Sequence, residues 1–209
     1  MTTRLVAWMG VLLPLLATPS AAVGQSLPGG WADLASAAVV PLRNGPNEVD
    51  LDGDGRLDMV FVAWRENFNA HGYSVFTFYR STQVAGAERW ELLPFFGSTR
   101  ETRDSFKTEE GADCLLADIQ VLQTGGARAP VMVVIGRRDF GQSFADSAKV
   151  MFTVYEMAAN PDSAFGWPAK YLQARRTIRS RRTYCDVEDA FRSELHIQAD
   201  DHGQPRGAE

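Results

Sequence analysis

Short apolar runs rich in β-branched and aromatic residues dominate the chain from about residue 57 onward. Runs of this kind predict strands at residues 57–64, 73–80, 89–95, 115–122, 131–137, 150–157 and 171–179. Turn sequences such as Gly125-Gly126 and Asn160-Pro161 separate them. No long helical pattern lies between the runs, so parallel βαβ units are not expected. The sequence therefore predicts a mainly β fold, an antiparallel two-sheet β-sandwich.

Two details refine this picture. Tyr73 and Val75 alternate with Ser74 and Phe76, and both resulting faces of the run 73–80 are largely apolar, which predicts a sheet that packs between layers. Short α-helices are expected only near the ends of the chain. Residues 31–39 form one candidate, and the other follows Asp186, whose carboxylate suits a helix N-cap and precedes an apolar stripe.

The first residues are expected to direct export. Arg4 precedes the uncharged stretch Leu5–Ala17, and small residues then allow cleavage after Ala22 or Gly24. The alternative is an uncleaved membrane anchor, but the apolar run is short and contains a proline. We expect a signal peptide at 1–22, a segment with a short helix at 23–44, the sandwich at 45–197 and a disordered tail at 198–209. The mature protein would then be periplasmic or secreted.

Composition narrows the classes of function. The formal charge of −5 argues against nucleic-acid binding, which needs clustered positive charge. Three histidines and two cysteines are too few for most multi-ligand zinc or iron sites. In an oxidising compartment Cys114 and Cys185 favour a structural disulfide, and the alternative is a pair of buried free thiols.

The strongest motif is the acidic loop at residues 50–58, with sequence DLDGDGRLD. Four carboxylates at alternate positions would repel one another in a folded loop unless a hard divalent cation neutralised them. Calcium prefers oxygen ligands, whereas zinc prefers nitrogen and sulfur, so calcium is the expected cation. In an EF-hand loop the twelfth residue is a glutamate that binds calcium with both oxygens. Counted from Asp50, the twelfth residue here is Phe61, so we expect a shorter loop between strands. The alternative is an Asp/Gly-rich turn without metal. The expected ligands are the carboxylates and one carbonyl: Asp50, Asp52, Asp54, Asp58 and the Arg56 carbonyl.

Two further loops mix charges, amides and aromatic residues, which suits recognition on a rigid sandwich. One lies at 65–72 and the other at 137–146. Alternatively, their Asn and Asp residues make turns and their phenylalanines close the edge of the core. The candidate ligand-binding residues are Arg65, Asn67, Asn69, His71, Arg138, Asp139 and Gln142. An arginine-rich run at 175–182 either meets an anionic ligand or forms a solvated strand.

Catalytic machinery is not evident in the sequence. Residues 141–145 resemble a nucleophile elbow only superficially, since Ala145 replaces the second glycine and the strand–turn–helix context is missing. We therefore expect a protein that is not an enzyme.

Several segments resemble the CarG-like family of carbapenem intrinsic-resistance proteins. They are VDLDGDGRLDMVFVAWRENFNAHGYSVFTFY from residue 49, the RRDFGQSFAD and KVMFTVYEM segments, and YCDVEDAF. The acidic loop followed directly by a strand and ENFNAH makes the match specific. The resemblance covers residues 45–195.

The resemblance implies a periplasmic β-sandwich, a bound cation on the same ligands and a homodimer. It also implies protection against carbapenems by a mechanism other than hydrolysis. The protein would act by binding the antibiotic or by shielding a cell-wall target. The family fold is related to bacterial inhibitors of invertebrate lysozyme, which use a Ser-Gly-x-Tyr loop. That tetrapeptide does not occur here, and His71-Gly72-Tyr73 is the nearest match. The alternative function is an inhibitor or binding partner of a secreted hydrolase such as lysozyme.

Overall fold

The computed structural model describes residues 34–68, 72–97, 102–111, 113–126, 129–160 and 166–198. The predicted signal peptide and the C-terminal tail from residue 199 lie outside this part of the chain. Within it the fold is two β-sheets and the helix α2 (Val187–Leu195), which confirms the predicted mainly β sandwich. None of the described helices combines the length and apolarity that crossing a bilayer requires.

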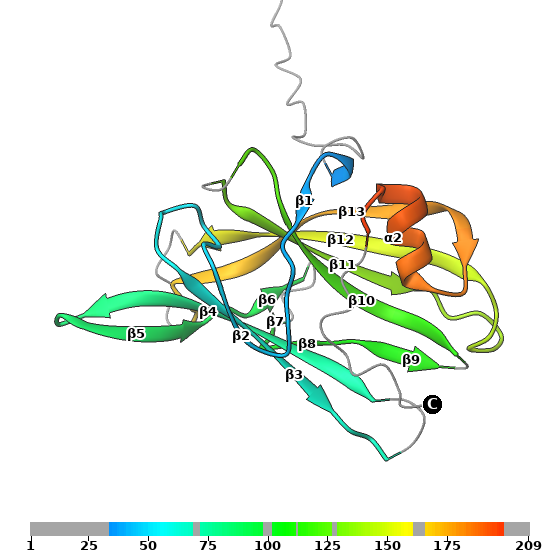
Figure 1. Cartoon of the computed structure of the whole chain (residues 1–209), viewed down its shortest axis with the longest axis horizontal. Helices are drawn as coiled ribbons and strands as arrows, with labels where there is room; N and C mark the ends of the chain where they lie inside the picture. The colour runs from blue at the N-terminus through cyan, green and yellow to red at the C-terminus, as the bar shows by residue number, and fades with distance from the viewer. Residues whose placement is uncertain are drawn as a thin grey trace, which may run out of the picture.

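The larger sheet, called sheet A, has eight strands in the described residues (Figure 1). Its order is β1-β10-β11-β12-β13-β6-β7, with β9 also paired to β10. The strands are β1 (Ala38–Val39), β6 (Phe95–Phe96), β7 (Thr102–Arg103), β9 (Glu109–Gly111), β10 (Cys114–Gln123), β11 (Val131–Arg138), β12 (Ala148–Ala159) and β13 (Lys170–Tyr184).

The smaller sheet, called sheet B, has the order β2-β3-β4-β5, with β8 paired to β4. Its strands are β2 (Gly45–Val49), β3 (Asp58–Arg65), β4 (Tyr73–Val84), β5 (Ala87–Leu92) and β8 (Phe106–Lys107). The β4–β5 hairpin extends beyond the body of the sandwich in Figure 1.

The described strands pair in antiparallel fashion with one exception. Leu172 and Gln173 of β13 pair in parallel with Phe95 and Phe96 of β6. This short parallel contact differs from the purely antiparallel arrangement that was expected. It arises because the chain reaches β6 from sheet B and therefore enters the edge of sheet A without a hairpin turn.

Two apolar cores hold the layers together. The first lies between the sheets and includes Val60, Phe76 and Phe78 of sheet B and Ile119 and Val133 of sheet A. The second lies between the opposite face of sheet A and α2; it includes Leu34, Val134, Phe152, Ala190 and Phe191. Sheet A is therefore covered on both faces, which explains why its strands are near-continuous apolar runs.

A glycine allows α2 to approach sheet A. A Cβ atom at Gly136 would lie 2.7 Å from Val187 Cγ1 and 2.9 Å from Phe191 Cε2. Such contacts are too short for packed carbon atoms, so only glycine permits this helix-to-strand distance. As predicted, Asp186 caps the helix, and its side chain accepts a hydrogen bond from the Glu188 backbone N–H.

Two expectations need correction. The Phe76 face of β4 is buried, but Tyr73, Val75 and Tyr79 on the opposite face are partly exposed, so no layer of the described chain covers them fully. The candidate helix at 31–39 does not reach Val39, because Ala38 and Val39 pair with Gln123 and Leu122 as β1. Pairing with the edge of β10 satisfies the backbone groups that a continued helix would have satisfied within itself.

Candidate functional site: the acidic loop

The acidic loop joins two neighbouring strands of sheet B. β2 ends at Val49 and β3 begins at Asp58, so the loop closes a hairpin between antiparallel strands. Gly53 has φ 76° and Gly55 has φ 85°, a backbone region that glycine adopts without steric cost. The two glycines therefore allow the chain to reverse its direction within the acidic loop.

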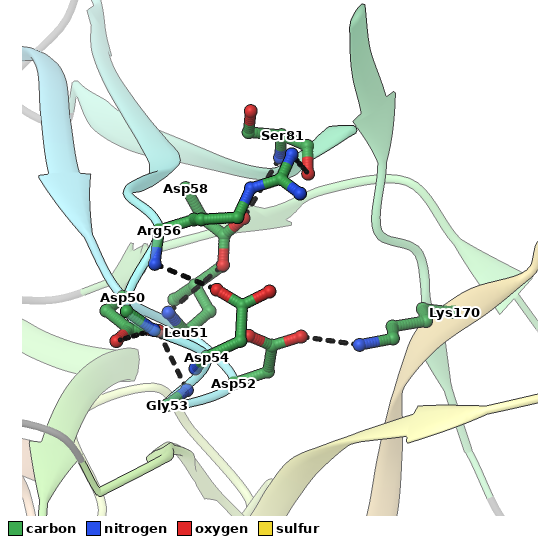
Figure 2. A network of polar contacts seen from close by, with 10 residues as sticks. Asp50, Leu51, Asp52, Gly53, Asp54, Arg56, Asp58, Ser81 and Lys170 are labelled. Carbon is green, nitrogen blue, oxygen red and sulfur yellow. Dashed lines mark hydrogen bonds and ion pairs between the residues drawn. The ribbon is translucent and has the colours of Figure 1, made fainter. Parts of the chain in front are cut away.

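Side-chain hydrogen bonds to the backbone shape the loop (Figure 2). Asp50 accepts from the backbone N–H groups of Gly53 at 2.8 Å and Gly55 at 2.9 Å. Asp54 accepts from the Arg56 N–H at 2.8 Å. The Asp54 contact is a typical Asx turn, whereas Asp50 reaches three and five residues along the loop. Together these contacts fix the direction of the Asp50 and Asp54 carboxylates without a partner from outside the loop.

Asp58 links the loop to the next strand. Its two oxygens accept from the backbone N–H groups of Leu51 at 3.1 Å and Ser81 at 2.9 Å, and the residue is only 3% exposed. Burial raises the pKa of the Asp58 carboxyl, these two donors oppose that shift, and the charges of Asp52 and Asp54 add to it. Burial is thus the main cause of the raised pKa of Asp58, and the neighbouring carboxylates make a smaller contribution in the same direction.

Asp52 is the carboxylate with a cationic partner. Lys170 Nζ, from the start of β13 in sheet A, donates to Asp52 Oδ2 at 2.5 Å (Figure 2). Burial acts to raise the pKa of Asp52, but the hydrogen bond and charge of Lys170 outweigh it, so the pKa is lowered. The Asp54 backbone N–H and the Arg80 charge act in the same direction. A positive group from the other sheet is thus already drawn to this loop.

Three of the predicted ligands converge. Asp50, Asp52 and Asp58 each place a carboxylate oxygen so that these atoms lie within 4.8 Å of one another. Asp54 is not part of that group and bonds to the loop backbone instead. The Arg56 side chain points to sheet B, where its guanidinium donates to the Ser81 carbonyl at 3.3 Å. The donor set is entirely oxygen, which fits a hard cation such as Ca²⁺.

The residues predicted in the 65–72 loop are only partly described. The Arg65 guanidinium lies 5.3 Å from the centre of the Tyr73 ring and donates to its hydroxyl. The Asn67 backbone N–H donates to Glu66, and the side chain of Asn67 is exposed. Asn69 and His71 lie outside the described residues, so their proposed role stays a prediction.

In the 137–146 loop, two of the predicted ligand-binding residues have structural partners. Arg138 donates to the Cys185 carbonyl at 3.0 Å and to the Phe144 carbonyl at 2.6 Å, and so braces the loop. Asp139 accepts from Arg179 at 2.5 Å. Gln142 is exposed. Between described residues, no hydrogen bond or ion pair joins this loop to the 65–72 loop.

The two cysteines form a disulfide. Cys114 at the start of β10 is bonded to Cys185, which directly precedes the N-cap of α2, and their Cα atoms lie 5.6 Å apart. The bridge therefore fixes the helix N-terminus to sheet A. The Leu115 backbone N–H supports the same junction by donating to Asp186 at 3.2 Å.

Sequence reasoning did not find Lys170. It lies 118 residues from Asp52 along the chain, and a lysine at the start of a strand carries no distinguishing signal. Only the packing of the two sheets brings it to the loop.

The fold and this loop define a two-sheet β-sandwich protein with a carboxylate-lined hairpin. Comparison with known proteins gives the family: the model described as "Carbapenem resistance protein CarG-like" matches residues 42–193. The chain therefore belongs to the CarG-like family. Among solved structures it is similar to the crystal structure of CarG, with a TM-score of 0.62 and 22% sequence identity. That match covers 81% of this chain and 99% of the other. A search of curated proteins found no match.

Proposed function

We propose that the protein is an exported, non-catalytic binding protein that protects against carbapenems and whose acidic loop holds calcium. Membership of the carbapenem-resistance family is the observation that carries the antibiotic link. The protein would act in the periplasm, by binding the antibiotic or by shielding a cell-wall target.

The convergence of Asp50, Asp52 and Asp58 supports calcium binding. Calcium binds six to eight oxygen ligands in flexible geometry, and a loop with several carboxylates and an available backbone carbonyl, that of Arg56, can supply part of such a shell. The cation would supply positive charge that removes the repulsion between the carboxylates. The role we assign to it is structural, since it would connect β2, β3 and the loop.

Calcium is expected to raise the melting temperature of the mature protein. At a hundredfold excess over the dissociation constant, a ligand bound only to the folded state adds about 2.7 kcal/mol, or roughly 5–10 °C for a domain of this size. The Asp52→Ala variant should lose most of this shift. Differential scanning calorimetry in calcium and in chelator measures it.

Asp189→Asn provides the matched control for the calcium experiment. It also removes one carboxylate, but from an exposed pair with Arg192 on α2, and should keep the full calcium shift. Equal melting of wild type and Asp52→Ala in calcium and in chelator would contradict the metal site.

If the antibiotic link is correct, the protein should protect cells from a carbapenem without hydrolysing it. Expression in the periplasm of a carbapenem-susceptible Gram-negative host should raise the minimum inhibitory concentration of a carbapenem, at least fourfold by our expectation. A version lacking residues 1–22 should give no protection. The purified protein should leave the ultraviolet absorbance of the carbapenem unchanged, and steady loss of that absorbance would instead identify a hydrolase.

A protein partner is the second candidate. Phe68, Phe140 and Phe144 are 96%, 67% and 51% exposed, and exposed aromatic side chains on loops favour contact with another protein. An inhibitor of a secreted hydrolase such as lysozyme would form a stoichiometric complex in size-exclusion chromatography. A carbapenem-binding protein would not.

We also propose that the protein is a homodimer. The outer face of sheet B is its best candidate surface, because Phe61 and Trp90 are each 42% exposed there and line a shallow apolar hollow with Pro46, Met59 and Tyr79. Exposed apolar side chains that gather on one sheet face favour contact with another protein surface.

A further inference from the structure

A second site candidate lies away from the acidic loop, at the edge where sheet A meets β8. It is a cavity of about 180 Å³ that is open to solvent on one side. Strands from both sheets contribute to its wall, but the acidic loop does not. Its lining combines apolar and cationic groups: Phe95, Phe106, Ile135, Arg103, Arg137 and Tyr155.

Arg137 is held firmly at this cavity. Its guanidinium donates to Glu109 at 3.1 Å and lies 5.2 Å from the centre of the Phe106 ring. An ion pair and a cation–π contact together fix the plane of the guanidinium, which leaves its remaining N–H groups available in a defined direction.

Arg103 differs from Arg137 because its charge has no counterpart. Among the described residues, no hydrogen bond or ion pair involves its side chain. Its neighbour Asp104 does not compensate for it at the cavity, because alternation along the chain places Asp104 at a different pocket with Thr102. Counting only described residues, the two guanidinium groups at the cavity and the Glu109 carboxylate that pairs with Arg137 carry a net charge of about +1.

Tyr155 adds a neutral donor. Its ring packs edge-to-face on Phe95, with ring centres 5.2 Å apart. Burial raises the pKa of the Tyr155 hydroxyl, and although Arg137 and Arg103 oppose that shift, the pKa stays above its ordinary value. The hydroxyl is therefore protonated at neutral pH and can donate a hydrogen bond. No described residue accepts one from it.

We propose that this cavity binds the carboxylate group of a small organic monoanion. The guanidinium groups of Arg103 and Arg137 pair with the carboxylate, for which their planar donor geometry is suited, and the Tyr155 hydroxyl donates to it. Phe95, Phe106 and Ile135 surround the hydrocarbon part of the ligand. This site is independent of the calcium loop and of the antibiotic link.

Two properties favour a carboxylate over a phosphate, and the volume limits the size of the ligand. The net charge of the described groups at the cavity matches one negative charge, whereas phosphate carries more than one at neutral pH. The three apolar side chains would gain nothing from a fully hydrated inorganic ion but would bury the methylene groups of an organic acid. The volume is below the range of about 300–1,000 Å³ typical of sites for drug-sized ligands, so it suits a ligand of a few heavy atoms.

Titration calorimetry with propionate tests the proposal. The mature wild-type protein should bind propionate with a dissociation constant of roughly 0.1–10 mM, within the affinity that so small a ligand can reach. Propionamide has the same shape without the charge, and it should bind at least tenfold more weakly. Inorganic phosphate should also bind at least tenfold more weakly.

Arg103→Gln is the decisive variant. Because Arg103 is exposed and has no partner among the described residues, the variant should fold normally and still bind propionate at least tenfold more weakly. Arg89→Gln, an exposed arginine on β5 of sheet B, is the matched control and should bind like the wild type. Tyr155→Phe should weaken binding several-fold and serves as a second, independent variant.

Several results would overturn the proposal: no binding of propionate at 50 mM, equal binding of propionate and propionamide, or tighter binding of phosphate. Unchanged binding by Arg103→Gln would do so as well. Melting curves of each variant, recorded without ligand, separate a lost contact from a lost fold.

Discussion

Replacing Cys114 and Cys185 together with alanine is expected to lower the free energy of unfolding by about 4 kcal/mol. The bridge joins residues 71 positions apart, and the loop-entropy model assigns roughly this stabilisation to a loop of that length. For a domain of this size the melting temperature should fall by roughly 8–16 °C. Guanidinium-chloride unfolding of the mature protein, followed by circular dichroism, measures the change.

Reduction of the wild-type protein is the control for packing. Cys114 is only 5% exposed, so its replacement also removes a buried side chain, whereas a reducing agent opens the bridge and leaves both side chains in place. If the bridge accounts for most of the loss, the reduced wild type should unfold at a denaturant concentration close to that of the double variant, and the remaining difference measures the lost packing of Cys114. A wild-type unfolding midpoint that does not respond to full reduction would contradict the stabilising role of the bridge.

Glu194→Leu is expected to destabilise the protein by about 3 kcal/mol. Glu194 lies on α2, is 3% exposed, and accepts from the backbone N–H groups of Arg181 and Arg182 and from the Tyr184 hydroxyl at 2.9–3.0 Å. Leucine would leave these donors without an acceptor at the contact between α2 and β13. The ion pair with the exposed Arg181 side chain contributes little of this amount, because solvent screens it. Urea unfolding at pH 7 measures the loss.

The difference in unfolding free energy between the wild type and Glu194→Leu should depend on pH, because the pKa of Glu194 is shifted in the folded protein. Burial acts to raise that pKa, but Arg181, Arg182 and Tyr184 together lower it below the ordinary value. A carboxyl whose pKa is lowered in the folded state stabilises the folded protein at pH values above the pKa of the unfolded state. This contribution is lost as the pH falls through the pKa of the folded state. The gap between wild type and Glu194→Leu should thus narrow below about pH 4.

Glu156→Gln, at a half-exposed ion pair with Arg175, should cost less than about 0.5 kcal/mol. If the difference in unfolding free energy between the wild type and Glu194→Leu stays constant down to pH 3, the stabilising role of the ionised Glu194 carboxylate is contradicted.

The long strands were predictable because their pattern is local. Each apolar run of sheet A became a strand of eight or more residues, β10 to β13, and covering both faces of the sheet explains the runs. The two- and three-residue strands β7, β8 and β9 were not predictable. Such segments hold too few residues for alternation to be visible, and their pairing depends on where longer strands happen to lie.

The functional residues can also be separated into those that the sequence could predict and those that it could not. The acidic loop was visible because its carboxylates lie within nine residues of one another, and three of them do converge. Arg138 and Asp139 looked available for ligands in the sequence, yet folding gives them partners from distant segments, Cys185 and Arg179. The cavity around Arg103 was invisible, because its wall is assembled from separate strands of both sheets.

The unequal pairing of β13 bears on the solubility of the protein. Only Leu172 and Gln173 pair with β6, so most of this 15-residue strand presents an open edge among the described residues. An open edge is a template on which a second chain can add a strand and begin to aggregate. Here Glu194 already accepts from the backbone N–H groups of Arg181 and Arg182, and two register shifts interrupt the β12–β13 ladder. Five arginines lie in the same stretch, and long charged side chains on an exposed edge oppose the addition of another strand: Arg175, Arg176, Arg179, Arg181 and Arg182. The basic run is therefore expected to oppose extension of the sheet by a neighbouring molecule.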